Sequence, residues 1–194
     1  MDWATLMNRP AAYIHPARLA ACFGGTVTTA VCARLAAAER LHERLSAVIV
    51  EFYRLGAAVG PDAAAPEDRR VAVLVPEATR ELARRAGAVF FANAIAGAVR
   101  ADDVRRLRAR LGEALYAFAL KNRDLSGPSR DLVDDDGTGA IEEQGLRCLS
   151  AWCRSQPEAI AARVRLKAPP SAAIDRLEAS VIATGAAIVR RAAG

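Results

Sequence analysis

The sequence predicts an all-α protein, a compact single domain built from several helices around one long central helix. The chain has 194 residues, of which 53% are hydrophobic, so it is the size of one domain and can bury a substantial core. Aromatic residues make up only 5%, whereas alanine, the strongest helix former, is very frequent. Apolar residues also recur at steps of three and four, the helical period. We therefore expect residues 1–194 to form one α-helical domain.

Two helices are expected in the first third of the chain. Pro16 opens a short helix over residues 17–23, and the Gly24-Gly25 pair ends it. The long central helix is expected over Thr26–Val59, with a split near Ala36–Ala38 as the alternative. Its apolar stripe consists of Val31, Leu35, Ala38, Leu41, Leu45, Val48, Phe52 and Leu55.

The middle of the chain predicts two more helices. Residues 60–68 form a polar, turn-rich loop and a possible sub-boundary of the domain. Residues 71–75 read as an extended or single-turn segment, because no second β-rich run could pair with them. A helix follows over residues 76–99, and its many small residues allow close helix approach. The next is expected over residues 102–122, capped by Asp102-Asp103.

The last third begins with a second possible sub-boundary. Residues 123–139 form a long polar loop, a candidate for mobility or an exposed contact. Helices are then expected over residues 140–155 and 157–167, the second stopped by Pro169-Pro170. Ser171 is expected to cap the final helix. Its apolar positions are Ile174, Leu177, Val181 and Ile188.

Charge and hydropathy narrow the environment in which the protein works. The net charge of +5 is mild, and no basic run interleaved with aromatics predicts nucleic-acid binding. The N-terminus lacks a signal-peptide pattern. The longest uncharged run, residues 19–33, has 15 residues, whereas a spanning helix needs about 20. We therefore expect a soluble, cytoplasmic protein without direct membrane insertion.

No motif predicts an enzyme, a metal site or a cofactor. The common nucleotide-binding, hydrolase and zinc-protease signatures are absent from the sequence. His42 is expected on the exposed side of the long helix. Residues 134–143 match a calcium loop only partly, because Leu132 occupies its first ligand position. The cysteines have no zinc-site spacing and read as small buried hydrophobes; they are Cys22, Cys32, Cys148 and Cys153.

Residues 100–110 are the densest basic patch. The patch contains Arg105, Arg106, Arg108 and Arg110. Two interpretations stay open: a solvated face beside a buried stripe, or a docking face for an acidic or phosphate-like partner, since arginine binds carboxylates in a bidentate manner.

Three regions resemble the SctK family of type III secretion proteins, the YscK/PscK group. Residues 10–15, Pro-Ala-Ala-Tyr-Ile-His, resemble the opening of these proteins. Residues 82–120 are similar to the paired helices of the family. In the C-terminal third, the Gly-Leu, aromatic, proline and Arg-x-x-Leu-x-x-Pro positions follow each other in the same order as in the SctK family. These positions are Gly145, Leu146, Leu149, Trp152, Pro157, Arg163, Leu166 and Pro169.

The resemblance implies a non-enzymatic adaptor in the cytosolic sorting platform of the injectisome. Such proteins join the forkhead-associated domain of the inner-membrane ring protein (SctD) to the pod protein (SctQ), at the cytosolic base of the apparatus. The four patch arginines would then meet an acidic surface on the ring side. Tyr13 and His15 are further candidates for protein binding, or, with Trp152, a structural corner. The alternative is an unrelated all-helical cytoplasmic regulator or chaperone.

Overall fold

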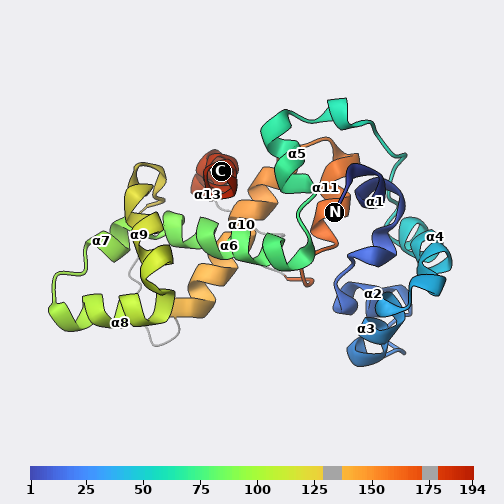
Figure 1. Ribbon diagram of the computed structural model, residues 1–194, viewed down its shortest axis with the longest axis horizontal. Helices are drawn as coiled ribbons and strands as arrows, with labels where there is room; N and C mark the ends of the chain where they lie inside the picture. The colour runs from blue at the N-terminus through green and yellow to red at the C-terminus, as the bar shows by residue number, and fades with distance from the viewer. Residues whose placement is uncertain (129–136, 172–178) are drawn as a thin grey trace. The chain divides into compact units, whose positions relative to one another are not determined.

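The protein is all-α, as the sequence predicts. The computed structural model describes residues 1–128, 137–171 and 179–194, and Figure 1 shows helices throughout these ranges. No strand occurs in the described residues. The abundance of alanine and the helical spacing of the apolar residues therefore predict the fold class correctly.

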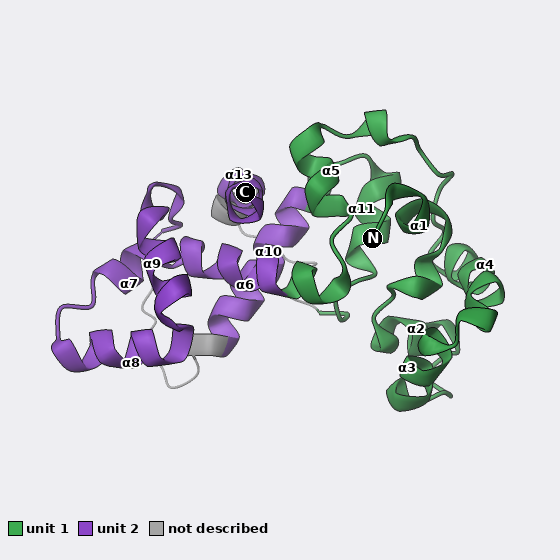
Figure 2. Cartoon of the chain, in the orientation of Figure 1, with its two compact units in different colours: residues 1–80, 153–171 green, residues 81–152, 172–194 purple. Residues whose placement is uncertain are grey.

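The helices gather into two compact units, coloured separately in Figure 2. Unit 1 comprises residues 1–80 and 153–171, and unit 2 comprises residues 81–152 and 172–194. Each of the two loops expected as sub-boundaries, 60–68 and 123–139, falls inside a single unit. Organisation of the whole chain as one domain stays a prediction.

Unit 1 begins with two short helices, of which only the second is predicted from the sequence. Helix α1 (Trp3–Asn8) is capped by Asp2, whose carboxylate accepts from the Thr5 amide at 2.7 Å. The single turn η1 (Pro10–Ala12) leads to α2 (Pro16–Cys22). The Gly24-Gly25 pair ends this region with φ values of 59° and 78°, which glycine adopts without strain.

The prediction of one long central helix is wrong, and the alternative prediction of a split near Ala36–Ala38 is confirmed. Helix α3 (Thr29–Ala37) stops at Ala38, whose backbone is extended with φ −89° and ψ 91°. A single turn, η2 (Glu39–Leu41), precedes α4 (His42–Phe52). No proline or glycine interrupts this segment, so the break has no strong local signal in the sequence.

The break changes which residues of α4 are buried. His42, expected on an exposed face, is buried, and its Nε2 lies 2.7 Å from the Ala36 carbonyl oxygen. Ile49 is fully buried. Val48 and Phe52, both placed on the buried stripe by the sequence pattern, are 38% and 50% exposed. The prediction that Val48 and Phe52 are buried is therefore wrong, because α4 packs independently of α3.

Residues 71–75, expected as an extended or single-turn segment packed on the core, are only partly helical. After the turn η3 (Pro61–Ala63), helix α5 (Pro66–Ala72) begins within the predicted loop 60–68. Its last residues, Val71 and Ala72, are buried as expected, and residues 73–75 lie outside the helix. Helix α11 (Glu158–Arg165) follows Pro157, as predicted.

Unit 2 contains shorter helices than the sequence predicts. The helix expected over residues 76–99 divides into α6 (Pro76–Phe90), which begins in unit 1, and α7 (Ala92–Ala96). The next divides into α8 (Ala101–Leu111) and α9 (Glu113–Lys121) at Gly112. The φ of this glycine is 80°, in the left-handed region that other residues avoid.

Asp102 and Asp103 do not cap α8. The N-cap is Arg100, which makes no side-chain capping bond, and the two aspartates lie in the first turn. There they remain favourable, because the N-terminus of a helix carries a partial positive charge.

Unit 2 is completed by the turn η4 and two further helices. The turn η4 (Arg123–Leu125) lies in the predicted loop 123–139. Part of this loop is outside the described residues. Leu132 and the first residues of the partial calcium motif are among the residues that are not described. Helix α10 (Gly137–Arg154) matches the expected helix 140–155, and α13 (Ala179–Ala193) ends the chain. Ser171 is predicted to cap a helix whose first residues are not described by the structure. The predicted apolar positions Ile174, Leu177 and Val181 also have no described side chains.

Helices α6 and α10 approach so closely that two glycines are required. A Cβ added at Gly87 would lie 1.9 Å from the Ile141 carbonyl oxygen, and one at Gly145 would lie 1.8 Å from that of Ala83. Figure 1 shows the two helices crossing. The prediction that small residues within 76–99 allow another helix to approach closely is therefore confirmed at Gly87.

The core of unit 2 surrounds α10. Trp152 is fully buried, which supports the structural role that a single tryptophan at helical register predicts. Gly185 of α13 faces Ala151 and Cys148, since an added Cβ would lie 2.7 Å from the Ala151 Cβ. Ile188 is fully buried, as its position in the apolar pattern predicts.

Candidate protein-binding surfaces

The four patch arginines lie together on α8 and are exposed. Arg105 and Arg106 form ion pairs one turn back, with Asp102 and Asp103 respectively. Each pair lies on the helix surface, where such contacts contribute about 0–1 kcal/mol. Across α8 four arginines and two aspartates leave a net charge of +2. The face is therefore cationic, although less strongly than the arginines alone suggest.

Arg108 contacts two residues of α9. Its Nε lies 3.8 Å from Glu113, and its guanidinium carbon lies 5.1 Å from the centre of the Tyr116 ring. An exposed cation over an aromatic ring gains about 0.5–1 kcal/mol, which restricts the side chain while leaving its outer edge open. Together, Arg105, Arg106, Arg108 and Arg110 are hereafter called the α8 cationic face.

Tyr13 and His15 make structural hydrogen bonds within unit 1, whereas Trp152 belongs to unit 2. Tyr13 is 3% exposed and donates its hydroxyl proton to the Leu6 carbonyl at 2.7 Å; burial raises its pKa. His15 caps α2, because its Nδ1 accepts from the Ala17 amide at 3.2 Å. Burial, and then the positive charge of Arg18, lowers the pKa of His15. These contacts favour a structural role for the two residues, and a role in protein binding stays a prediction.

Arg163, one of the positions that carry the family resemblance, is a cation whose burial the sequence does not predict. Its side chain is bonded to three carbonyl oxygens at 2.9 Å: Met7 at the end of α1, Gly56 after α4, and Ala159 in its own helix. Burial lowers its pKa. Because three segments converge on one guanidinium, Arg163 holds α1 and the loop after α4 against α11.

Lys167 is a second buried cation. Its Nζ donates to the carbonyl oxygens of Ala72 at 2.5 Å and Leu74 at 2.8 Å, where α5 ends, and lies 5.8 Å from the centre of the Tyr13 ring. Burial lowers the pKa of this ammonium group to about 7. Lys167 therefore satisfies the C-terminal carbonyls of α5 at the expense of its own hydration.

The lowered pKa of Lys167 predicts that folding stability rises between pH 7 and pH 9. In this window the unfolded chain retains the lysine proton and the folded chain releases it, so the free energy of unfolding increases by about 2 kcal/mol. Urea titrations at pH 7, 8 and 9 measure the change. The Lys167→Met variant is expected to lose most of the slope, and an unchanged slope would contradict the assignment. Above pH 9 the Cys148 and Cys153 thiols, whose pKa burial raises to about 12, act in the opposite direction.

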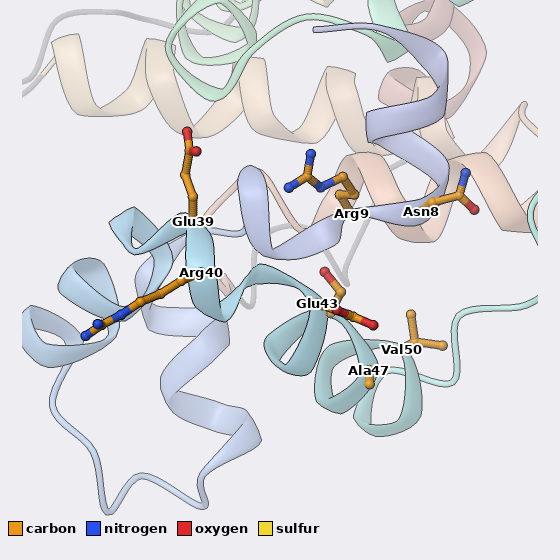
Figure 3. Close-up of a pocket in the computed structure, with 8 residues that line it drawn as sticks. Asn8, Arg9, Glu39, Arg40, Glu43, Ala47 and Val50 are labelled. Atoms are coloured by element: carbon orange, nitrogen blue, oxygen red, sulfur yellow. The ribbon is translucent and has the colours of Figure 1, made fainter.

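A hollow of about 670 Å³ lies in unit 1 between the end of α1, η2 and α4. It is lined by Asn8, Arg9, Glu39, Arg40, Glu43, Ser46, Ala47 and Val50. Figure 3 shows Glu39 and Arg40 projecting from η2 in different directions, with Glu43, Ala47 and Val50 on α4 below Arg9. The hollow exists because the chain breaks at Ala38, which brings η2 and the start of α4 near the end of α1.

The sequence contains little that could have revealed the hollow. Its charged residues belong to the ordinary polar faces of three short helical segments, and nothing in their spacing sets them apart. The possible split of the helix near Ala36–Ala38 is the one feature of the sequence that relates to the hollow. The buried roles of Arg163 and Lys167 are equally hidden, because their partners are distant in sequence.

The titratable side chains do not assemble a metal site in the described part of the chain. There, no three His, Cys, Asp or Glu side chains are close enough to hold a metal ion. Cys32, Cys148 and Cys153 are buried, as expected, while Cys22 is half-buried; all four are free thiols. No helix among the described residues is both long enough and apolar enough to cross a membrane.

These features define a class: an all-α protein whose buried cations Arg163 and Lys167 make structural hydrogen bonds to backbone carbonyls and whose α8 arginines are exposed. The chain belongs to the YscK family. The family model described as "YOP proteins translocation protein K (YscK)" matches residues 4–187, nearly the whole chain. The resemblance to SctK proteins is thereby confirmed, and membership implies a role in type III secretion, with partners in that apparatus.

Two curated relatives carry the name nodulation protein NolU. The chain is 29% identical to NolU of Rhizobium fredii over 164 residues, which is 82% of this chain and 72% of the relative. NolU of Sinorhizobium fredii (strain NBRC 101917 / NGR234) matches to the same extent. No solved structure matches the chain.

Proposed function

We propose that the protein is a non-enzymatic adaptor of the type III secretion sorting platform, linking the forkhead-associated domain of the ring protein to the pod protein. The observation that carries the proposal is the family match over residues 4–187. In this proposal the protein is cytoplasmic and lies at the cytosolic base of the inner-membrane apparatus. It acts by binding alone, without a cofactor.

The arrangement of charge supports a binding role. An adaptor needs separate faces for its two partners, and the charged faces described above occur on both units: the α8 cationic face in unit 2 and the hollow in unit 1. Most of the α8 arginine side chains are open to solvent. Such a face increases the rate of encounter with an acidic surface and selects against basic ones.

Binding of the wild-type protein to each partner tests the proposal directly. Purified full-length protein is mixed separately with the forkhead-associated domain of the ring protein and with the pod protein from the same operon, and the affinities are measured by calorimetry. Binding to both is expected. Absence of binding to both would overturn the proposed function.

Charge reversal on the α8 cationic face is expected to weaken binding to the ring protein. The variant Arg105→Glu/Arg108→Glu alters two exposed side chains one turn apart, which share a helix face. We expect an affinity loss of about tenfold or more, equivalent to about 1.4 kcal/mol, and weaker wild-type binding at high salt. Calorimetry at two salt concentrations measures both effects.

A matched variant separates the face from the overall charge. Arg34→Glu/Arg70→Glu makes the same change in net charge at exposed positions on α3 and α5. It should bind the ring domain within about twofold of the wild type, since long-range effects of exposed charges are screened at physiological salt. Equal losses in the two variants would show that the α8 cationic face is not the site.

A further inference from the structure

We infer that Asp102 and Asp103 compete with the acidic partner for the arginines of the α8 cationic face. In the free protein these two carboxylates occupy arginines of the face, and the carboxylates of the partner displace them on binding. The inference rests on the proposed function, in which this face binds the ring protein. It adds the chemistry of the partner surface and two residues that limit the affinity of the face.

Two arginines of the face carry a carboxylate in the free protein. Arg105 forms an ion pair with Asp102. Arg106 forms the equivalent pair with Asp103, again three residues back along α8. Side chains three residues apart on a helix are neighbours, and an acidic residue on the N-terminal side of its partner also suits the helix dipole. The carboxylates of a partner therefore meet guanidinium groups that are already paired.

Both ion pairs are open enough to exchange their carboxylates. The side chains of Arg105 and Asp102 are 77% and 76% exposed, and those of Arg106 and Asp103 are 75% and 37% exposed. Water and salt screen ion pairs at such positions, so each pair stabilises the protein only weakly. The aspartates consequently lower the affinity for an acidic partner without preventing its binding.

This pairing distinguishes α8 from other helices that expose arginine. Arg34 on α3 and Arg44 on α4 form no ion pair with any residue in the described ranges. On α8 even Arg108 lies 3.8 Å from a carboxylate, that of Glu113. The net charge of α8 is nevertheless +2. The helix therefore still attracts an acidic surface, while three of its arginines are paired with carboxylates of the same chain.

Displacement of the aspartates favours a partner that presents several carboxylates at once. A carboxylate that replaces an aspartate exchanges one exposed ion pair for another of similar strength, and it loses translational freedom on binding. A folded acidic surface holds its carboxylates in place and loses this freedom once for all of its contacts. The partner chemistry that fits α8 is therefore a preformed acidic protein surface, of the kind proposed for the ring domain.

The variant Asp102→Asn/Asp103→Asn of the full-length chain tests the inference. Asparagine retains the size of aspartate and removes its charge. The matched control is Glu67→Gln/Glu77→Gln, which removes two exposed charges in the first turns of α5 and α6. Calorimetry at physiological salt measures the affinity of each protein for the ring domain and for the pod protein, and circular dichroism measures helix content. If the double variant loses helix content, Asp102→Asn alone replaces it.

A second set of variants tests whether the effect depends on the arginines. Arg105→Gln/Arg106→Gln removes the two paired guanidinium groups. The same change is then combined with Asp102→Asn/Asp103→Asn, which completes a double-mutant cycle. If the aspartates act by occupying these arginines, their removal should increase affinity by less than about twofold when the arginines are absent, because an exposed charge without its partner acts only through screened repulsion.

The aspartate variant is expected to bind the ring domain about fivefold more tightly than the wild type, a factor of about two for each exposed pair. Asp102→Asn alone should bind about twofold more tightly, and the glutamate control within about 1.5-fold of the wild type. Unchanged or weaker binding of the aspartate variant would overturn the inference, because the aspartates would then only support α8 or contact the partner themselves. An equal gain in the control, or a full gain without the arginines, would also overturn it.

The wild type distinguishes failure of this inference from failure of the proposed function. All of the outcomes above require a wild type that binds the ring domain, so they leave the adaptor function standing. A wild type that binds neither partner overturns the adaptor function and this inference with it. A wild type that binds the pod protein alone overturns the assignment of the α8 cationic face to the ring protein, and therefore the inference as well.

Discussion

Replacing Gly145 by alanine is expected to destabilise unit 2 by more than about 3 kcal/mol. The new Cβ would lie 1.8 Å from the Ala83 carbonyl oxygen and 2.5 Å from its carbon, so α6 and α10 would have to separate. Overpacking in a well-packed core costs about 1–3 kcal/mol, and here the obstacle is backbone rather than a flexible side chain. Thermal unfolding followed by circular dichroism should show a midpoint lowered by about 6–12 °C.

Gly60→Ala is the matched control for this prediction. Gly60 has φ −67° and no atom within 4 Å of an added Cβ, so the substitution meets neither a clash nor a strained backbone. Its midpoint should stay within about 2 °C of the wild type. Gly87→Ala should resemble Gly145→Ala, because its Cβ would meet the Ile141 carbonyl at 1.9 Å. A stable Gly145→Ala protein would mean that the two helices do not touch at this point.

Replacing Arg163 by methionine is expected to cost unit 1 about 3 kcal/mol. The change retains most of the apolar volume but leaves the carbonyls of Met7 and Gly56 without the guanidinium. Loss of a partner from a buried acceptor costs about 1–3 kcal/mol, which applies to the Met7 carbonyl, while the contact with Gly56 is part-buried and adds less. Urea unfolding monitored by tryptophan fluorescence measures the loss, since Trp3 lies on α1, the helix that Arg163 anchors.

Arg165→Met provides the comparison within the same helix. The Arg165 side chain is 37% exposed and forms an ion pair with Glu158 at 2.6 Å, which is 79% exposed. Such a surface pair is worth about 0–1 kcal/mol, so the midpoint should hardly change. Equal destabilisation by the two variants would show that the three carbonyl contacts of Arg163 contribute little to folding.

The helices that the sequence predicts correctly are those with strong local signals. Pro16, Pro76 and Pro157 each stand at the start of a helix or next to it, where the missing amide proton and the restricted φ of proline are favourable. The Gly24-Gly25 pair ends the α2 region in the left-handed conformation expected of glycine. These features depend only on neighbouring residues, so a single sequence suffices to find them.

The breaks in two of the predicted helices, 26–59 and 102–122, were harder to foresee. At Gly112 the interrupting residue is a glycine with φ 80°, a local cause that apolar periodicity conceals. At Ala38 the local residues favour continuation of the helix, and the break accompanies the bond between His42 and the Ala36 carbonyl. Packing of α4 as a separate helix then exposes Val48 and Phe52, against the periodic pattern.

Of the two candidate binding surfaces, one can be predicted from the sequence and the other cannot. The α8 cationic face follows from four arginines close together in sequence, and the structure brings all of them onto one short helix. The hollow needs three segments that meet only after the chain breaks at Ala38. Tyr13 and His15 were candidates from sequence order, and their hydrogen bonds to Leu6 and Ala17 support a structural role.

By itself, the sequence determined that this protein is helical and that it resembles the SctK family, because helix propensity, proline and glycine signals and motif order are properties of neighbouring residues. Only the tertiary structure decided which cations are buried. Arg163 and Lys167 look like any surface arginine and lysine, but their carbonyl partners lie up to 156 and 95 residues away. Hydrogen bonds between such distant residues arise from packing, which no local pattern encodes.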